Sequence, residues 1–449
     1  MQQSDNDTIV ALATPPGRGG IGIVRLSGPN VSSIAFSLLG KRLEPRVATS
    51  AQFTDANGVM MDSGLAIYFA GPASFTGEDV LELHGHGGPV PMDMLIQHCL
   101  LLGARLAGAG EFTQRAFLND KIDLTQAEAI SDLIDSASQQ AARAAVRSLC
   151  GEFAHYINDL AHEITSLRMF VEAAIDFPEE EIDFLADQEV TARLDRVARG
   201  FTQIEAAATQ GQLLRDGMIL VIVGRPNVGK SSLLNRLAGY DAAIVTAQAG
   251  TTRDILREDI HIDGMPLHIV DTAGLHESSD PVEIEGMRRA RRALKQADHV
   301  LYISDRPGSD DFSQMAKELP RDIPVTTVIN KIDINGGTPG VSLTDAGNTV
   351  GVSALTGEGL DDLRDYLGRL MGYSAADSGQ VIARRRHLDA LARARVHFTD
   401  GKRALLDQGA GEIMAEELRL AQNCLGEITG QVTSDELLGQ IFSNFCIGK

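Results

Sequence analysis

The chain has 449 residues, of which 43% are hydrophobic and 22% are charged, and its formal net charge is −21 at pH 7. At roughly 100–200 residues per domain, this length predicts two to four folded domains. An evenly acidic surface repels phosphate backbones, so contact with nucleic acid is expected only through a local basic patch or through a partner.

The N-terminus, the apolar runs and the cysteines predict a cytoplasmic protein without a membrane segment. The stretch MQQSDNDTIV lacks the pattern of a signal peptide, and apolar runs such as Met218–Val223 are far shorter than the ~20 residues of a membrane span. The four cysteines show no CxxC spacing, which suits reduced thiols in a cytoplasm; they are Cys99, Cys150, Cys424 and Cys446.

Residues 1–119 are predicted to form an α+β domain. Short apolar runs bounded by glycine and proline are typical of strands, and four of them occur here: DTIVALAT, GIGIVRLSG, SGLAIYFAG and DVLELHGHGG. The stretch PVPMDMLIQHCLLLGA has the character of a helix.

The next part of the chain predicts an all-α domain in two halves, residues 120–216 and 374–449. Apolar residues recur at helical spacing from Leu124 to about Asp176, where Pro178 and the run EEEID interrupt the pattern. Residues 217–373 lie between the halves and alternate apolar strand runs with helices, which is the α/β pattern. We therefore predict an α/β domain inserted into a helical domain.

The inserted domain begins with a phosphate-binding loop. Residues Gly224–Ser231 fit GxxxxGK[ST], follow the strand run MILVIV and precede the helix SSLLNRLAG. Backbone N–H groups and the helix N-terminus of such a loop surround phosphates. Lys230 is expected to reach the outer phosphates, and Ser231 is expected to bind Mg²⁺.

Three further motifs follow in order, and one of them, NKID, identifies the base as guanine. DTAG (Asp271–Gly274), NKID (Asn330–Asp333) and SAL (Ser353–Leu355) each end a predicted strand. The Asp333 carboxylate can accept both the ring N–H and the exocyclic amine of guanine, a donor pair that adenine lacks on that edge. A GTP-hydrolysing P-loop domain is the prediction.

The residues expected to promote hydrolysis differ from those of Ras-like proteins. The glutamine that orients water there is replaced by Leu275, whose side chain is apolar. Asn227 and the switch segment TAQAGTTRD (Thr246–Asp254) resemble those of potassium-activated G proteins. That resemblance implies a K⁺ ion held by Asn227, Thr246, the Gln248 backbone and Thr251, and a Mg²⁺ ion held by Ser231 and Thr252.

The motifs and the switch together give the predicted GTP-binding set. Its members are Asn227, Val228, Gly229, Lys230, Ser231, Ser232, Thr246, Thr251, Thr252, Asp271, Thr272, Ala273, Gly274, Asn330, Lys331, Asp333, Ser353, Ala354 and Leu355.

Motifs outside this domain resemble those of one family along the whole chain. They are DTIVALATPPGRGGIGIVRLSG, SFTGEDVLELHGHGG, GEFTQRAFLNDKIDLTQAEA, AAIDFPEEEID and the terminal FCIGK. This combination is similar to the MnmE (TrmE) family of bacterial tRNA-modification GTPases. The family implies a homodimer formed through the N-terminal domain, and an FAD-dependent partner, GidA (MnmG). It also implies addition of an aminomethyl or carboxymethylaminomethyl group to carbon five of the wobble uridine of tRNA.

In that family the one-carbon unit comes from a tetrahydrofolate derivative, the 5-formyl or the 5,10-methylene form. The positions that match its folate-contacting residues are Arg25, Glu82, Lys121 and Lys449. The cations suit the glutamate tail of folate, and the carboxylate suits the amino and ring N–H groups of the pterin. Glu283 matches the family position that orients the attacking water, although the pattern HESSDPVEIEGM alone favours it no more than Glu277, Asp280 or Glu285.

Several alternatives remain open at this point. Cys446 is interpreted either as a nucleophile or proton carrier for the modification, or as a small buried packing residue. His84 and His86 form a pair that can bind metal, but no third ligand follows at useful spacing. The basic stretches Arg288–Lys295 and Arg384–Arg386 are interpreted either as solvated helix faces or as contacts for tRNA phosphates.

Two other functions compete with the modification enzyme. One is an Era-like GTPase that assists ribosome assembly, although the chain shows no recognisable RNA-binding module. The other is a GTP-driven dimer scaffold whose partner carries all of the carbon chemistry.

Overall fold

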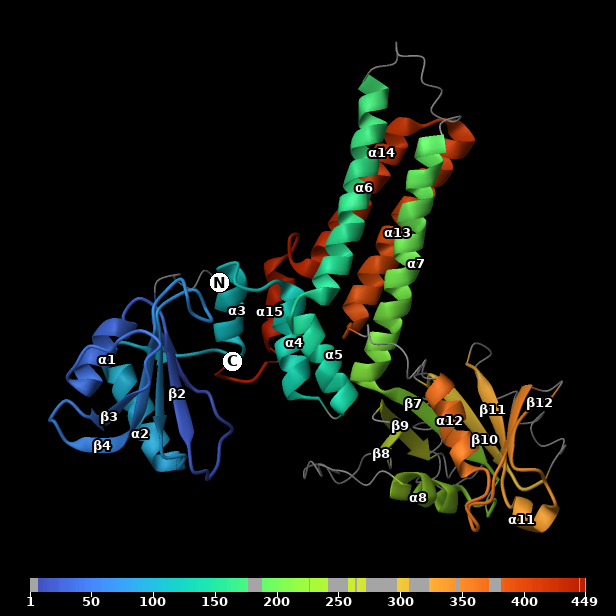
Figure 1. Cartoon of the computed structure of the whole chain (residues 1–449), viewed down its shortest axis with the longest axis horizontal. Coiled ribbons are helices and arrows are strands. Elements are labelled where there is room, and N and C mark those ends of the chain that lie inside the picture. The colour runs from blue at the N-terminus through green and yellow to red at the C-terminus, as the bar shows by residue number, and fades with distance from the viewer. Residues whose placement is uncertain are drawn as a thin grey trace, which may run out of the picture. The chain divides into compact units, whose positions relative to one another are not determined.

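The computed structural model describes residues 7–136, 138–176, 188–225, 227–240, 257–262, 265–271, 297–306, 323–344, 347–370, 381–443 and 445–448. It confirms the predicted fold class, because an α+β part, a set of long helices and an α/β part are all present (Figure 1). The chain divides into two compact units. One comprises residues 1–131, 149–197 and 390–449, and the other comprises residues 132–148 and 198–389. The bounds of the four predicted segments stay a prediction.

The first unit contains a six-stranded sheet with strand order β3-β4-β5-β2-β1-β6. All neighbouring strands are antiparallel except β1 and β6, which are parallel. The strands are β1 (Ile9–Leu12), β2 (Gly22–Ser27), β3 (Thr49–Thr54), β4 (Met60–Phe69), β5 (Val80–Gly85) and β6 (Arg105–Leu106).

The two faces of this sheet differ in what covers them. Helices α1 (Val31–Leu39) and α2 (Pro89–Leu101) pack on one face, over a buried core that includes Val24 and Leu83. Successive side chains of a strand point to opposite faces, so Arg25, next to Val24, belongs to the other face. Helix α3 (Glu111–Leu118) contributes to that second face, where its Phe112 packs with residues of β1.

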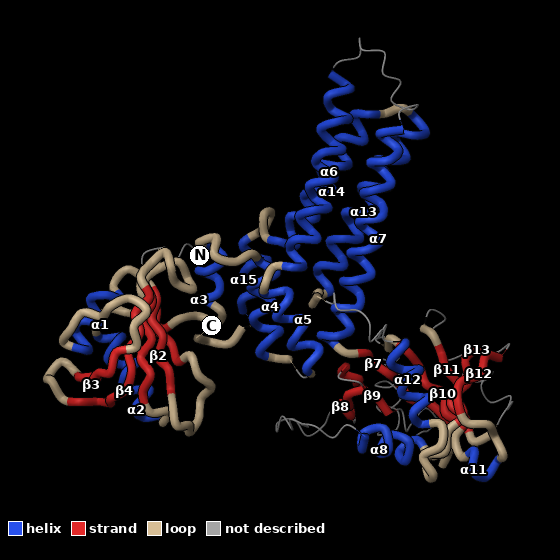
Figure 2. The backbone as a smooth tube through the Cα atoms, viewed as in Figure 1, coloured by secondary structure: helices blue, strands red, loops and turns tan. Residues whose placement is uncertain are grey.

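Long helices form the rest of the first unit and continue along the chain into the second (Figure 2). They are α4 (Leu124–Ile134), α5 (Gln139–Leu149), α6 (Glu152–Asp176), α7 (Gln188–Asp216), α13 (Arg385–Gln408), α14 (Gly411–Thr429) and α15 (Asp435–Ser443).

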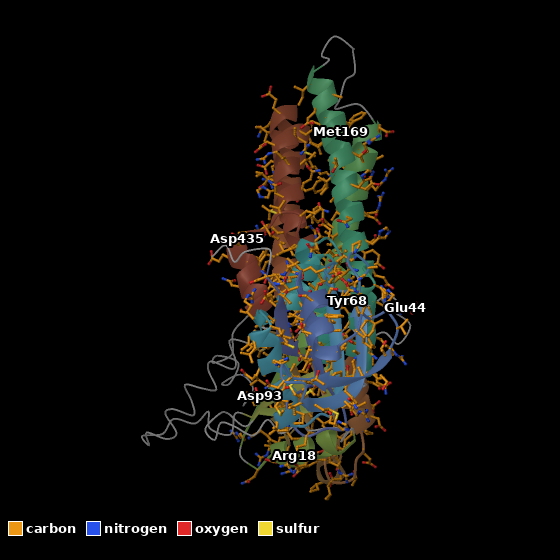
Figure 3. All side chains as sticks on the ribbon, turned by 90° about the vertical axis from the view of Figure 1, so that its left-hand side faces the viewer. Arg18, Glu44, Tyr68, Asp93, Met169 and Asp435 are labelled. Carbon is orange, nitrogen blue, oxygen red and sulfur yellow. The ribbon has the colours of Figure 1, made fainter. Side chains whose placement is uncertain are left out.

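Helices α6 and α14 lie side by side, and small residues permit their close approach. A Cβ atom at Gly411 would already be 3.2 Å from the Ile175 side chain. The Arg168 guanidinium donates a 2.6 Å hydrogen bond across the same pair to Gln422. Met169, the next residue of α6, is largely exposed (Figure 3). No helix within the described ranges combines the length and the apolar character of a membrane span.

The second unit contains a seven-stranded sheet with strand order β12-β13-β11-β10-β7-β9-β8. The five central strands are parallel, and β12 and β8 are antiparallel edge strands. The strands are β7 (Met218–Gly224), β8 (Arg257–Ile262), β9 (Met265–Asp271), β10 (His299–Ser304), β11 (Val325–Ile329), β12 (Gly340–Thr344) and β13 (Gly347–Gly351), and the helices are α8 (Lys230–Tyr240), α11 (Ile332–Asn335) and α12 (Leu360–Leu370).

The central strands are buried on both faces, as expected for a parallel sheet. Leu220, Val221, Ile222 and Val223 of β7 are all fully buried. In the neighbouring strand β10, burial lowers the pKa of His299 to about 4, so this imidazole is neutral at physiological pH. It is 2.9 Å from the Thr326 hydroxyl of β11, which satisfies the buried polar atom.

One buried carboxylate links the segments that enter and leave the α/β part. Asp132, near the end of α4, accepts hydrogen bonds of 2.7 Å from Arg215, in the last turn of α7, and from Arg384, just before α13. The Asp132 side chain is only 4% exposed, so two cations compensate one buried charge. Arg384 is therefore committed to an ion pair, which contradicts the interpretation of all three arginines 384–386 as a solvated face.

Candidate functional site

The phosphate-binding loop lies at the carboxyl end of β7 and leads into α8. Lys230, the first residue of the helix, donates hydrogen bonds of 2.8 and 3.0 Å to the backbone oxygens of Gly224 and Arg225. Its side chain is thus folded over the loop that it is predicted to serve. Asn227 has a φ of 65°, a left-handed conformation that turns the loop back toward the helix.

Asn330 joins three loops at the same edge of the sheet. Its amide donates a 2.8 Å hydrogen bond to the Val228 carbonyl, and its side-chain oxygen accepts a 3.0 Å bond from the Ala354 N–H. These contacts connect the ends of β7, β11 and β13. The carboxyl ends of parallel strands are where open α/β sheets bind ligands, and the NKID and SAL motifs meet the phosphate loop there.

The close approach of Asn330 to the phosphate-binding loop explains why residue 229 is a glycine. Its φ is 92°, and a Cβ atom would lie 2.4 Å from the Asn330 amide nitrogen. Any larger residue would push the phosphate loop away from the NKID loop.

The two charged residues of NKID are also held in place. Lys331 donates a 2.8 Å hydrogen bond to the Asn227 carbonyl and lies 3.2 Å from Asp305. The Ser353 hydroxyl donates a 2.6 Å hydrogen bond to one Asp333 oxygen. The structure therefore brings the base-reading and phosphate-binding motifs of the prediction to one place.

The remaining predicted nucleotide and metal residues fall into two groups. Ser231 and Ser232 are exposed in the first turn of α8, and Leu355 is 74% exposed. Asp271 ends β9. The others lie outside the described residues: Thr246, Gln248, Thr251, Thr252, Thr272, Ala273, Gly274, Leu275 and Glu283.

A second site is built on the sheet face opposite α1 and α2. Arg25 of β2 and Glu82 of β5 are direct partners in the strand register. The Arg25 Nε and terminal amine lie 3.0 and 2.8 Å from one Glu82 oxygen, with side-chain exposures of 25% and 16%. The guanidinium is also 5.9 Å from the ring centroids of both Phe75 and Phe112. The predicted folate cation and carboxylate therefore form an ion pair, and the cation lies near two aromatic rings.

Lys121 reaches the same loop that carries Phe75. Its ammonium donates a 3.0 Å hydrogen bond to the Pro72 carbonyl, and Asn119 donates a 2.7 Å bond to the Thr76 carbonyl. The loop connecting β4 and β5 thus contacts both Arg25 and Lys121.

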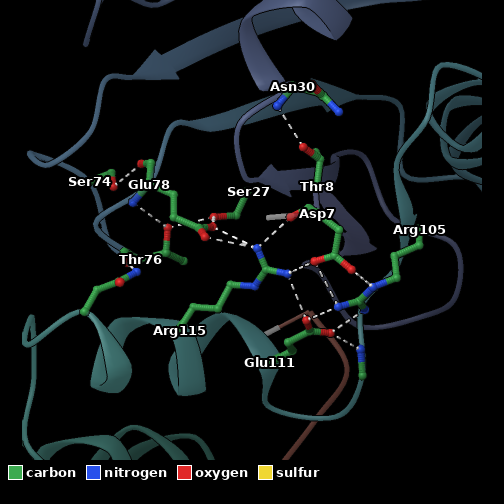
Figure 4. A network of polar contacts seen from close by, with 12 residues as sticks. Asp7, Thr8, Ser27, Asn30, Ser74, Thr76, Glu78, Arg105, Glu111 and Arg115 are labelled. Atoms are coloured by element: carbon green, nitrogen blue, oxygen red, sulfur yellow. Dashed lines mark hydrogen bonds and ion pairs between the residues drawn. The ribbon is translucent and has the colours of Figure 1, made fainter. Parts of the chain in front are cut away.

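A network of polar contacts fixes this loop to the sheet and to α3 (Figure 4). Ser27 of β2 lies 2.7 Å from both the Thr76 hydroxyl and a Glu78 oxygen, and Arg115 of α3 lies 3.0 Å from Glu78. Burial alone would raise the pKa of Glu111, but hydrogen bonds from Arg105, the Gly108 N–H and Arg115 hold this pKa below its ordinary value. The network keeps α3, and hence Phe112, in a fixed position under Arg25.

The end of the chain lies against the same domain. The Gly110 N–H donates a 3.3 Å hydrogen bond to the Cys446 carbonyl, and Ile447 forms an antiparallel bridge with Ala109. Gly448 has a φ of 97°, and a Cβ atom there would be 2.1 Å from the Leu12 carbonyl oxygen. The Cys446 side chain is exposed, which contradicts the interpretation of it as a buried packing residue. Lys449 lies outside the described residues.

A cavity of about 550 Å³ lies on the face of the N-terminal sheet that α1 and α2 cover. Its lining includes Leu12, Arg18, Met92 and Ile96, so it lies on the α2 side and is separate from the Arg25–Glu82 pair.

The two histidines of the sequence HGH belong to different carboxylates. His84 Nε2 lies 3.2 Å from Glu82, and His86 Nδ1 lies 2.7 Å from Asp62. Within the described ranges, no group of three His, Cys, Asp or Glu side chains is arranged to hold a metal ion. Because His84 and His86 contact different carboxylates, their arrangement does not support a shared metal site.

Sequence reasoning missed Phe75 and Phe112, and it considered His84 only as a metal ligand and not as a neighbour of Glu82. The period of two along β5 could have placed His84 beside Glu82, because residues i and i+2 of a strand share a face. Phe75 and Phe112 come from a loop and from a helix, and no local pattern indicates that both meet Arg25.

Known proteins are similar to this chain over its N-terminal part, over its helical part and over its whole length. A family model of the N-terminus of the GTP-binding protein TrmE matches residues 8–121, and a model of the MnmE helical domain matches residues 124–446. The tRNA modification GTPase MnmE of Erwinia tasmaniensis is 56% identical over 451 residues, which cover 99% of each chain.

Solved structures are similar to parts of the chain. A variant of Era from Aquifex aeolicus is 28% identical over 40% of this chain and 66% of that one, with a TM-score of 0.27. The G domain of the T. maritima FeoB iron transporter is 22% identical over 34% of this chain and 98% of that one, with a TM-score of 0.26. Because both family models match and the MnmE relative agrees from end to end, the chain belongs to the MnmE family of tRNA modification GTPases.

Proposed function

We propose that this GTPase acts with the FAD-dependent protein GidA (MnmG) on the wobble uridine of tRNA. Together they add an aminomethyl or carboxymethylaminomethyl group to carbon five, and a 5-formyl- or 5,10-methylene-tetrahydrofolate supplies the one-carbon unit. The observation that carries the proposal is the partly exposed Arg25–Glu82 ion pair, whose guanidinium lies near two aromatic rings on the sheet face opposite α1 and α2.

The chemistry of this face suits a folate. The Glu82 carboxylate can accept hydrogen bonds from the amino and ring N–H groups of a pterin, as charge-assisted bonds of the stronger kind. Phe75 is 39% exposed and offers a flat apolar surface for a ring. Lys121 and Lys449 supply cations for the carboxylates of the glutamate tail. In support of this, Gly448, the residue before Lys449 in the sequence, lies against the Leu12 carbonyl of β1, and the neighbouring Ala11 is the strand partner of Arg25.

The nucleotide domain supplies the switch. Ser231 is exposed at the start of α8, so its hydroxyl can join Thr252 in binding Mg²⁺. K⁺ would be held by Asn227, Thr246, the Gln248 backbone and Thr251, where its charge offsets that of the transition state. We further propose a homodimer formed through the N-terminal domain, and a cytoplasmic location.

The proposed cation predicts a salt effect on GTP turnover. Turnover should be much faster in K⁺ than in Na⁺ at equal ionic strength, because Na⁺ is too small for the same set of oxygen ligands. Asn227→Ala should remove most of this difference, whereas nucleotide affinity should stay nearly unchanged. Steady-state phosphate release and titration with a fluorescent GDP check both. Equal rates in the two salts would reject the K⁺ site.

Nucleoside analysis of tRNA tests the proposed function as a whole. In a strain lacking this gene, the modified wobble uridines should be replaced by their unmodified or partly modified forms, and the gene on a plasmid should restore them. An Era-like role in ribosome assembly predicts unchanged wobble uridines and altered ribosomal particles instead. A pure scaffold predicts loss of the modification but no binding of folate to the isolated chain.

A further inference from the structure

Three side chains form a row on the open face of the N-terminal sheet. Glu82 and His84 are two residues apart on β5 and therefore point to the same side. Arg25 is the cross-strand partner of Glu82, and Ile23 is the partner of His84. The order along the row is thus cation, carboxylate and imidazole.

The two oxygens of Glu82 have different partners. One oxygen accepts a 3.0 Å hydrogen bond from Arg25 Nε and also lies 2.8 Å from a terminal guanidinium nitrogen of the same residue. The other oxygen lies 3.2 Å from His84 Nε2. Each carboxylate oxygen can accept two hydrogen bonds, so the His84 contact leaves the second oxygen with capacity for a ligand. Because each oxygen of the carboxylate has a partner of its own, the two contacts together restrain its orientation.

We propose that His84 is a positioning residue for Glu82: its Nε2–H donates to the second carboxylate oxygen and holds that oxygen toward the ligand. This rests on the proposed folate site, which assigns Glu82 to the pterin. Without the imidazole donor, the carboxylate is free to rotate until Arg25 binds both of its oxygens, a geometry that Arg–carboxylate pairs adopt frequently. Both carboxylate oxygens of Glu82 would then face Arg25 and not the ligand.

The neighbouring histidine provides a matched control. His86 is also on this segment, but its side chain is 72% exposed and its ring contacts Asp62 instead of Glu82. A substitution there removes an imidazole from the same sequence motif and leaves the row intact.

Binding of 5-formyl-tetrahydrofolate to the full-length protein, measured by calorimetry, tests the role. Because a hydrogen bond to a charged group is involved, His84→Leu should weaken binding by about 10-fold. His84→Gln should stay within about two-fold of the wild type, because its amide nitrogen is as many bonds from Cβ as Nε2. His84→Asn, whose shorter amide cannot reach Glu82, should behave like His84→Leu, and His86→Gln should bind like the wild type.

A double-mutant cycle separates positioning from simple packing. If His84 acts through Glu82, His84→Leu should cause no further loss of binding in a Glu82→Gln background. Additive losses would reject the positioning role, as would wild-type binding by His84→Leu.

A second measurement applies even if the wild type binds no folate, an outcome that would reject the proposed function. In ¹H–¹⁵N spectra of the histidine rings, His84 should be the Nε2–H tautomer in the protein without ligand. Glu82→Gln should shift its Nε2 signal and leave the signals of His86 in place. A protonated Nδ1 and a bare Nε2 on His84 would overturn the inference whatever the ligand.

Discussion

Replacing Glu283 by alanine should lower GTP turnover by ~10²–10⁴-fold, the range for loss of a positioning or acid–base group. The reason is Leu275, which stands where Ras-like proteins have the glutamine that orients the attacking water. An apolar side chain cannot orient water, so we propose that a carboxylate of the following segment does so, and Glu283 is the one that matches the family position. GTP affinity should barely change, because the group acts on the water and not on the nucleotide. Single-turnover hydrolysis and nucleotide titration measure the two quantities separately.

The same segment supplies the controls. Glu277→Ala, Asp280→Ala and Glu285→Ala remove equal charges nearby and should leave turnover within a few-fold of the wild type. Normal turnover in Glu283→Ala, together with a large loss in one of these three, would move the role to that residue. All four positions lie outside the described residues, so the kinetics decide the assignment.

Much of the fold was predictable because its signals are local. The apolar run of β7 followed by GRPNVGKS specifies a strand, a loop and a helix within a dozen residues or so, and the structure has all three. The long helices follow from apolar residues that recur at helical spacing. Similarly, NKID and SAL were expected at strand ends, and Asn330 and Ser353 lie there.

Edge elements were missed for a physical reason. Strand β3 has the sequence TSAQFT, and its burial alternates only weakly, with Phe53 as its one fully buried side chain. Strand β6 has two residues. Such strands exist because a neighbouring strand offers free backbone groups, and their own side chains carry little of the pattern.

The open face of the N-terminal sheet shows the limit of sequence reasoning more sharply. The residues Arg25 and Glu82 are 57 positions apart, and their pairing depends on the register of β2 against β5. Phe112, which contacts Arg25, lies on α3, and Arg115 and Glu111 hold this helix to other segments by ion pairs. Resemblance to a family supplied the residues, but only the three-dimensional register supplies the arrangement.

Replacing Cys446 by serine should abolish modification of the wobble uridine and leave K⁺-stimulated GTP hydrolysis intact. The backbone of the tail is fixed, because the Gly110 N–H binds the Cys446 carbonyl at 3.3 Å and Ile447 pairs with Ala109. The thiol itself is exposed, so it is available as a nucleophile or as a proton carrier. Serine keeps the size of the side chain but is a far weaker nucleophile and acid. Nucleoside analysis of tRNA from a complemented deletion strain and phosphate release by the purified protein measure the two activities.

Cys150 provides the matched control, because it is also a free and exposed cysteine. It follows α5, and no predicted site residue lies beside it in the sequence. Cys150→Ser should therefore modify tRNA at the wild-type level. If Cys446→Ser retains full modification, the thiol has no part in the chemistry. If modification is lost together with GTP hydrolysis, the serine has disturbed the fold or the switch, and the assignment to carbon transfer is wrong. Loss of modification alone, with Cys150→Ser unaffected, shows that the modification needs the sulfur atom of Cys446, as a nucleophile or as a proton carrier.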